Sequence, residues 1–244
     1  MNTWMPWTIA GKDFKVLKRK RTIIYTLIVF PLVLAVGLPA LVWLLITKDG
    51  VQPGNMLPYF NAFDFLFIIS ASLIPTSMAS YNFVGEKVEK SLEPLLATPV
   101  TDNEILLGKS IASFLPSMIA TYLGGLIYMI LIDIITRQQL GYLYYPNWSV
   151  VVFFLLAAPL ACIFSIELCV IVSARVTDIR ASQQFGRLLI LPFAVIYVLG
   201  EINIVPLVTS NLLIISAMLI IVDAILFFIS RSTFNREEIL TKWK

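Results

Sequence analysis

Long apolar runs separated by short polar segments dominate this sequence. A helix that crosses the hydrocarbon core of a membrane needs about 20 mostly apolar residues. Six stretches reach or approach this length, and they cover residues 22–47, 59–83, 105–136, 149–174, 185–199 and 205–230. We therefore predict an all-α, polytopic membrane protein with six transmembrane helices, folded as one transmembrane domain over residues 1–244. The segment 200–206 is compatible with a simple loop or with a re-entrant pair of turns.

The composition agrees with this pattern. Hydrophobic residues make up 59% of the 244 residues and charged residues 14%, with a mean hydropathy of +0.88. A soluble domain carries about 25% charged residues, so this chain cannot cover a water-facing surface. The first apolar run is also longer than the core of a signal peptide, which is about 7–15 residues. We interpret it as a retained span.

Positive charge is concentrated on one side of the predicted membrane. Six spans place both termini on the same side, and all of the 18 lysines and arginines except Lys48 and Arg137 fall there. Because loops rich in Lys and Arg remain in the cytoplasm, we predict that the arm 1–21 and the tail 231–244 are cytoplasmic. Trp4 and Trp7 are interspersed with charged residues in the arm, which predicts an amphipathic helix in the membrane interface.

The segment 84–100 is the one long charged stretch between two spans. Apolar residues recur there at spacings of three and four, with Glu and Lys between them, which predicts a short amphipathic helix at the cytoplasmic surface. The apolar positions are Val84, Val88, Leu92, Leu95 and Leu96. Thr101 and Glu104 then fit a capping box, so the third span should begin there.

The next motif, Gly108-Lys109-Ser110, resembles the end of a phosphate-binding loop. That loop requires a further glycine five residues before Gly108, and position 103 is Asn103. A membrane-length apolar run also accompanies the motif, so nucleotide binding at this position is excluded. We expect Lys109 to mark the start of the third span and to extend toward lipid phosphates.

The charged segment and the residues after it resemble the signature of ABC-2 type permeases, the membrane-spanning subunits of ATP-binding-cassette exporters. The order and spacing of the signature match over residues 86–109. The matching residues are Glu86-Lys87, Ser91-Leu92-Glu93, Leu95-Leu96, Thr98-Pro99-Val100, Glu104-Ile105 and Gly108-Lys109. The chain departs from the usual pattern at Val88, where an acid is frequent, at Lys90, where glycine is usual, and at Ser91, where threonine is usual.

The resemblance implies that 84–100 is a coupling helix, docked in a groove of a separate ATPase subunit. Leu92, Leu95 and Leu96 would enter the groove, and Glu86, Glu89 and Glu93, with Ser91, would lie at its rim. The chain itself would be a transport subunit and not an enzyme, without a cofactor of its own, because ATP and Mg²⁺ would bind to the partner. The other implied partners are a second copy or a related permease, and the lipid bilayer of a prokaryotic plasma membrane; nucleic acid is not among them.

Two acids interrupt apolar runs, Glu167 in the fourth and Asp223 in the sixth. A charge at the centre of a membrane helix costs at least about 2.5–3.5 kcal/mol, so these acids either line a transport path or tie helices together through hydrogen bonds. We expect Asp64 and Asp133 to lie near the outer interface, hydrated and without a role. The chain contains no histidine, which excludes zinc or haem ligation by imidazole.

Two other classes of protein are alternatives to a permease. An ion-driven secondary transporter would more often show inverted repeats, and the sequence has no visible repeat. A membrane-embedded enzyme could use Glu167 and Asp223. Asp64 and Asp223 could also form a catalytic pair, but neither of these two lies in a recognisable catalytic context.

Overall fold

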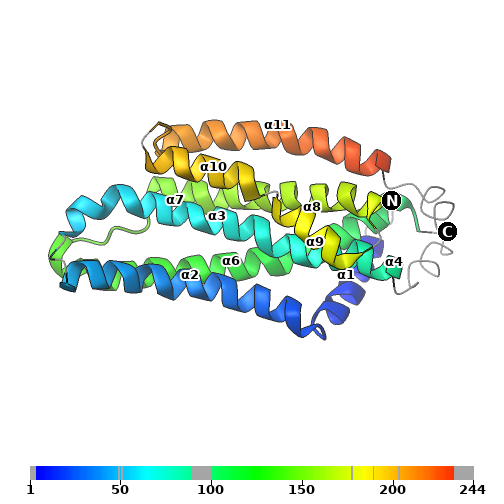
Figure 1. The fold of residues 1–244 in the computed structure, drawn as a ribbon, viewed down its shortest axis with the longest axis horizontal. Helices are drawn as coiled ribbons and strands as arrows, with labels where there is room; N and C mark the ends of the chain where they lie inside the picture. Colours follow the sequence, from blue (N-terminus) through cyan, green and yellow to red (C-terminus); the bar gives the residue numbers. More distant parts are fainter. Residues whose placement is uncertain are drawn as a thin grey trace.

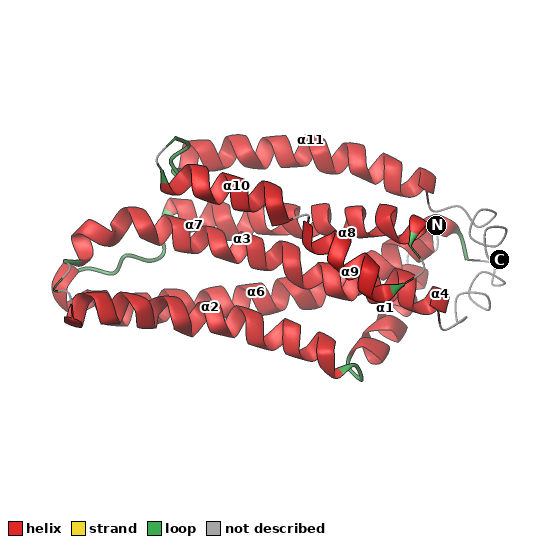
Figure 2. Ribbon diagram, in the orientation of Figure 1, coloured by secondary structure: helices red, strands yellow, loops and turns green. Residues whose placement is uncertain are grey.

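The computed structural model describes residues 4–48, 50, 52–88, 100–176, 178–188, 190–202 and 204–233. Within these ranges the chain is helical and contains no strand (Figure 2). The α-helices are α1 (Trp4–Leu17), α2 (Arg21–Lys48), α3 (Leu57–Ser80), α4 (Glu86–Val88), α6 (Asp102–Leu140), α7 (Trp148–Val152), α8 (Ala158–Arg175), α9 (Ile179–Leu188), α10 (Ile190–Glu201) and α11 (Thr209–Thr233). A 3₁₀ turn, η1 (Pro53–Met56), precedes α3, and two π-helical segments, η2 (Tyr81–Gly85) and η3 (Phe153–Ala157), extend α3 and join α7 to α8.

Among the described residues, six segments are long and apolar enough to cross a membrane, which confirms the six predicted spans. They are Arg21–Lys48, Tyr59–Gly85, Asp102–Leu140, Trp148–Ser173, Ile179–Gly200 and Thr209–Thr233. The third has 39 residues, so it is about 58 Å long at 1.5 Å per residue. The hydrocarbon core is about 30 Å thick, and α6 therefore extends beyond it.

The spanning helices lie side by side in an elongated bundle around α3 (Figure 1). Helix α3 packs against α2, α6, α8, α9 and α10, and it buries the largest share of its length among the candidate spans. Helix α2 covers α6 on one side of the bundle, and α11 covers α8 on the other. Many large apolar side chains of α2, α10 and α11 are exposed, as expected of surfaces that face lipid.

Close packing of α2 on α6 depends on Gly124. A Cβ atom at Gly124 would lie 2.8 Å from Cβ of Pro31 in α2, which is closer than two carbon atoms can approach. The core beside this contact is aromatic, and Phe65, Phe67 and Phe153 are almost completely buried in it.

Helix α1, α4 and the first turns of α6 gather at one end of the bundle, where the basic residues 18–21 join α1 to α2; we call this the basic end (Figure 1). Helix α3 reaches it through η2, where the second span ends at Gly85, and the chain continues as a helix into α4. A π-helical turn is wider than an α-helical one and rotates the residues that follow. Val84 is consequently buried, whereas Val88, four residues later, is 55% exposed.

The segment between α10 and α11 is a short turn. The backbone N–H groups of Ile204 and Val205 both donate to the carbonyl oxygen of Leu199, which closes the end of α10. The described residues of this segment therefore form a simple connection between two helices, the first of the two geometries that the sequence allowed.

Candidate functional site

A buried lysine holds together three elements at the basic end. Lys109 lies in the second turn of α6, and its side chain is fully buried. Its Nζ forms an ion pair with Oε2 of Glu86 in α4 and donates a 2.7 Å hydrogen bond to the carbonyl oxygen of Asn82 in η2. The same Nζ lies 3.7 Å from Oδ2 of Asp13 in α1.

A second lysine completes this ion cluster, which consists of Lys12, Asp13, Glu86 and Lys109. Nζ of Lys12 in α1 lies 2.9 Å from Oε1 of Glu86. The two carboxylate oxygens of Glu86 therefore contact two different cations, one on α1 and one on α6. The cluster contains two acids and two bases; Asp13, Glu86 and Lys109 are buried, whereas the Lys12 side chain is half-exposed.

The sequence of α1 places Asp13 inside the protein. Ile9, Asp13 and Leu17 recur every four residues and are all buried, so they form one face of the helix. Trp4 and Trp7 are exposed. Helix α1 is therefore two-sided, as the sequence indicated, and it packs along α6. Its position in the membrane interface stays a prediction.

Gly108 allows α1 to approach α6 this closely. A Cβ atom at Gly108 would lie 2.8 Å from Cβ of Ile9 and 2.9 Å from the carbonyl oxygen of Pro6. Any other residue would push α1 away from α6. Gly108-Lys109 is thus a packing motif, in which glycine provides space for α1 and lysine binds its acid.

The start of α6 is held by the predicted capping box. The hydroxyl of Thr101 accepts from the N–H of Glu104, and the Glu104 carboxylate accepts from the N–H of Thr101 at 3.0 Å. Farther along, the amide of Asn82 donates to Oγ of Ser113 at 2.9 Å. The capping box fixes the first turn of α6, and the Asn82–Ser113 bond joins α6 to η2.

The two acids of the ion cluster differ in acidity. Burial raises the pKa of the Asp13 carboxyl above its ordinary value, and the attraction of Lys109 offsets this only in part. Burial also acts to raise the pKa of Glu86, but the charge of Lys109 and the hydrogen bonds from Lys109 and Lys12 outweigh it, so this pKa is lowered. Glu86 is consequently the stronger acid of the two and the main counter-ion of Lys109.

The expectation that Lys109 extends toward lipid phosphates is wrong. Its ammonium group is directed into the protein, because Glu86, Asp13 and the carbonyl of Asn82 provide the contacts that lipid would otherwise supply. Sequence reasoning also missed Asp13. Its four-residue spacing from Ile9 and Leu17 was a signal, but the partner on α6 is 96 residues away and no local pattern indicates it.

Of the predicted ATPase-docking residues, the structure describes only Glu86. Glu86 lies at the start of the docking segment, and its carboxylate is occupied by Lys12 and Lys109. The other docking residues, Glu89, Ser91, Leu92, Glu93, Leu95 and Leu96, lie outside the described residues. Their docking role stays a prediction.

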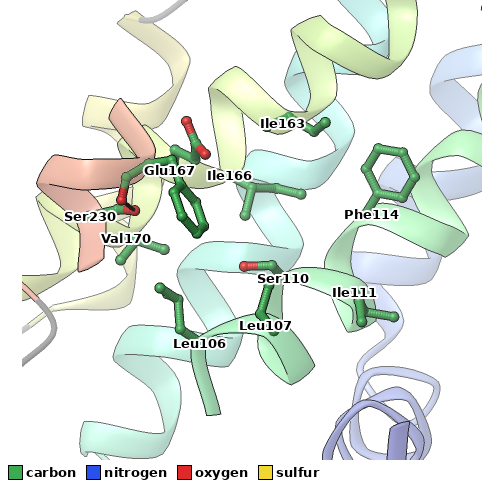
Figure 3. A pocket seen from close by; sticks show the side chains of 11 residues that line it. Leu106, Leu107, Ser110, Ile111, Phe114, Ile163, Ile166, Glu167, Val170 and Ser230 are labelled. Atoms are coloured by element: carbon green, nitrogen blue, oxygen red, sulfur yellow. Dashed lines mark hydrogen bonds between the residues drawn. The ribbon is translucent and has the colours of Figure 1, made fainter. Parts of the chain in front are cut away.

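The structure places Glu167 and Asp223 on two helices in contact, α8 and α11. Both residues are buried. Among the described residues, Oε2 of Glu167 and both carboxyl oxygens of Asp223 find no hydrogen-bond partner. The hydrogen bonds that would tie the helices together are therefore missing at these three oxygens. Glu167 also lines a pocket between α6, α8 and α11, and Ser230 lies on the same side of it (Figure 3).

The expectation of a hydrated Asp64 is also wrong. Asp64 is completely buried, and its Oδ1 accepts a 3.0 Å hydrogen bond from the hydroxyl of Tyr145. Burial and the neighbouring Asp64 raise the pKa of Tyr145 well above its usual value. The hydroxyl therefore stays protonated and can donate the hydrogen bond to Asp64. Asp133 has a structural contact too, because its Oδ1 accepts from the backbone N–H groups of Tyr144 and Tyr145.

Comparison with known protein families agrees with a membrane-spanning helix bundle. Residues 14–177 match a family model described as ABC-2 family transporter protein. The match covers more than half of the chain, from the end of α1 to α8, and includes both Glu86 and Lys109. No curated protein matches the chain. The chain therefore belongs to the ABC-2 transporter family, as a multi-pass membrane permease.

Proposed function

We propose that the chain is the membrane-spanning subunit of an ABC exporter driven by a separate ATPase subunit. ATP and Mg²⁺ would bind to that partner, and this chain would act with a second copy of itself or a related permease. The basic end would face the cytoplasm of a prokaryotic cell, because lysines and arginines gather there and such segments are retained on the cytoplasmic side.

The observation that carries this proposal is the position of Glu86. It lies three residues before the segment 89–99, where the docking leucines are found, and it binds Lys12 of α1 and Lys109 of α6. A partner that displaces the segment would therefore pull on α1, α3 and α6 together. Such rigid connections convert a small local displacement into a movement of packed helices.

The docking contacts follow from the chemistry of the segment. Leu92, Leu95 and Leu96 would enter an apolar groove of the ATPase, and Glu89 and Glu93 would face cations at its rim, with Ser91 beside them. Glu86 would connect the docked segment to α1 and α6 through its ion pairs with Lys12 and Lys109.

Affinity purification of the tagged chain from its own membranes in mild detergent tests the proposal. We expect an ATPase subunit to purify with it in stoichiometric amount and to hydrolyse ATP in a vanadate-sensitive manner. Leu92→Asp should abolish both, because a carboxylate does not enter an apolar groove without a large desolvation cost.

Leu143→Asp is the matched control, since Leu143 is an exposed leucine in the loop between α6 and α7, away from the basic end. This variant should retain the ATPase. A chain that purifies alone, or a Leu92→Asp variant that retains its partner, would contradict the coupling role of the segment.

A further inference from the structure

A pocket of about 290 Å³ lies between α6, α8 and α11, near the basic end of the bundle (Figure 3). Its walls are almost entirely apolar and include the aromatic rings of Phe114 and Phe227. Figure 3 shows Phe114 and Ile111 on one side of the pocket and Glu167 on the other. The volume is at the lower end of the range for small-molecule sites, about 300–1,000 Å³.

Among the residues that the structure describes, Glu167 is the only charged one that lines this pocket. The residue is 8% exposed, and its buried Oε2 has no hydrogen-bond partner in the described part of the chain. Asp223 precedes Phe227 by one helical turn on α11, and neither of its carboxyl oxygens has a hydrogen-bond partner within the described ranges. The pocket thus combines one acidic group, Glu167, with an apolar wall, and Asp223 lies on α11 outside the lining residues.

These features define the ligand that would fit. A carboxylate in an apolar site is stabilised by a cation, which disfavours anions and neutral molecules. A small inorganic cation such as Mg²⁺ or Ca²⁺ needs six or more oxygen ligands, and the remaining lining residues are mostly hydrocarbon. An organic ammonium group supplies the charge together with an apolar body, and aromatic rings attract such cations.

We propose that this pocket binds a small lipophilic organic ammonium ion, with its charge against Glu167 and its body against the walls that include Phe114 and Phe227. The inference rests on the proposed function in one respect: the bound ammonium ion is a substrate only if the chain is part of an exporter. Binding itself depends only on α6, α8 and α11, so it can be measured without the ATPase.

Equilibrium binding of radiolabelled benzyltrimethylammonium to the full chain tests the inference. The chain is placed in phosphatidylcholine nanodiscs without ATP, and binding to empty nanodiscs is subtracted. Unlabelled neopentylbenzene, which has the same shape without the charge, serves as a competitor. We expect saturable binding of the ammonium and at least about tenfold weaker competition by the neutral compound, as the loss of a charged contact implies.

Glu167→Gln keeps the size of the side chain and removes its charge. It should weaken ammonium binding by about tenfold or more and abolish the preference for the charged compound. Asp178→Asn is the control, because Asp178 is an exposed acid outside the pocket, and it should bind like wild type. Ser110→Leu fills the pocket from α6 without altering Glu167 and should weaken binding of both compounds.

Absence of saturable binding overturns the inference. Equal binding of the two compounds to wild type also overturns it, because it would indicate a site for neutral apolar molecules such as lipid chains. If Glu167→Gln does not fold, unchanged ammonium binding in Ser110→Leu overturns it equally. An ATPase that purifies with a chain unable to bind the ammonium would contradict the substrate class alone. Binding without an ATPase would contradict the proposed function alone.

Discussion

At the scale of single residues, Lys109 shows how a charge is accommodated where a long helix enters the bundle. Its ammonium group has exchanged water for Glu86, Asp13 and a backbone carbonyl. A buried ion pair contributes little net stability compared with apolar packing, but removing one partner leaves the other charge uncompensated. Positions 86 and 109 therefore constrain each other.

Lys109→Met should destabilise the protein by about 3–5 kcal/mol, because it leaves buried carboxylates without their cation. Thermal unfolding in detergent, followed by circular dichroism, measures the loss. Adding Glu86→Gln to this variant should recover part of the stability, since it removes an unpaired charge. Strictly additive losses in this double-mutant cycle would show that the two side chains are not coupled.

The same pair should affect stability in acid. The pKa of Glu86 is lowered from its ordinary value of 4.5, so its contribution is fully present above that value and is lost as the pH falls through the lowered folded value. Wild type should therefore lose more stability than Glu86→Gln as the pH falls below 4.5. Asp13 acts in the opposite direction, because its pKa is raised. Parallel pH curves for the two proteins would contradict the ion pair.

At the scale of elements, the contact between α1 and α6 attaches the N-terminal arm to the helix bundle. The face of α1 formed by Ile9, Asp13 and Leu17 is buried, and Gly108 lies where the two backbones come closest. The arm is thereby attached to α6, the helix that follows the proposed docking segment in the sequence. Movement of α6 would displace α1 as well.

Gly108→Ala should detach α1, because its Cβ would meet atoms of Pro6 and Ile9 at less than 3 Å. Amide hydrogen exchange of residues 4–17 should become faster, and the Lys109–Asp13 contact should weaken. Gly11→Ala is the matched control, since a Cβ atom at Gly11 would meet nothing within 4 Å. This change should leave exchange equal or slower, because alanine favours the helix over glycine by about 1 kcal/mol. Equal exchange in both variants would contradict the close approach.

At the scale of the whole molecule, the bundle has two chemically different ends. Basic residues and the ion cluster lie at one end, and a network of Asp64, Tyr128 and Tyr145 lies within the bundle toward the other. Cys162 and Cys169 are buried, so a cysteine introduced at an exposed position can be labelled selectively.

Orientation can be measured with a membrane-impermeant maleimide added to intact cells. Tyr142→Cys, at an exposed position in the loop between α6 and α7, should react. Thr8→Cys, on the exposed face of α1, should react only after the cells are opened. The reverse pattern would place the basic end outside the cell.

Local patterns in the sequence predicted much of this fold. The six spans required only the lengths of the apolar runs, the capping box at Thr101 required only residues three positions apart, and the two-sided arm required only helical spacing. The burial of Lys109 and Asp64 could not be predicted, because the partners that stabilise them, Glu86 and Tyr145, are distant in sequence. The preference of Lys for an interface and of Asp for water was overridden by tertiary contacts.

The sequence by itself determined that the protein spans a membrane six times, that its charges lie mainly at one end, and that residues 86–109 match an ABC-2 permease. Each of these follows from composition or from short-range spacing, which every conformation of the chain shares. Only the tertiary structure decided that Glu86 joins α1 to α6 and that Glu167 lines a pocket with Phe114 and Phe227. Such contacts depend on which helix faces meet, because a buried charge or an apolar wall acquires its energy only from the groups packed against it.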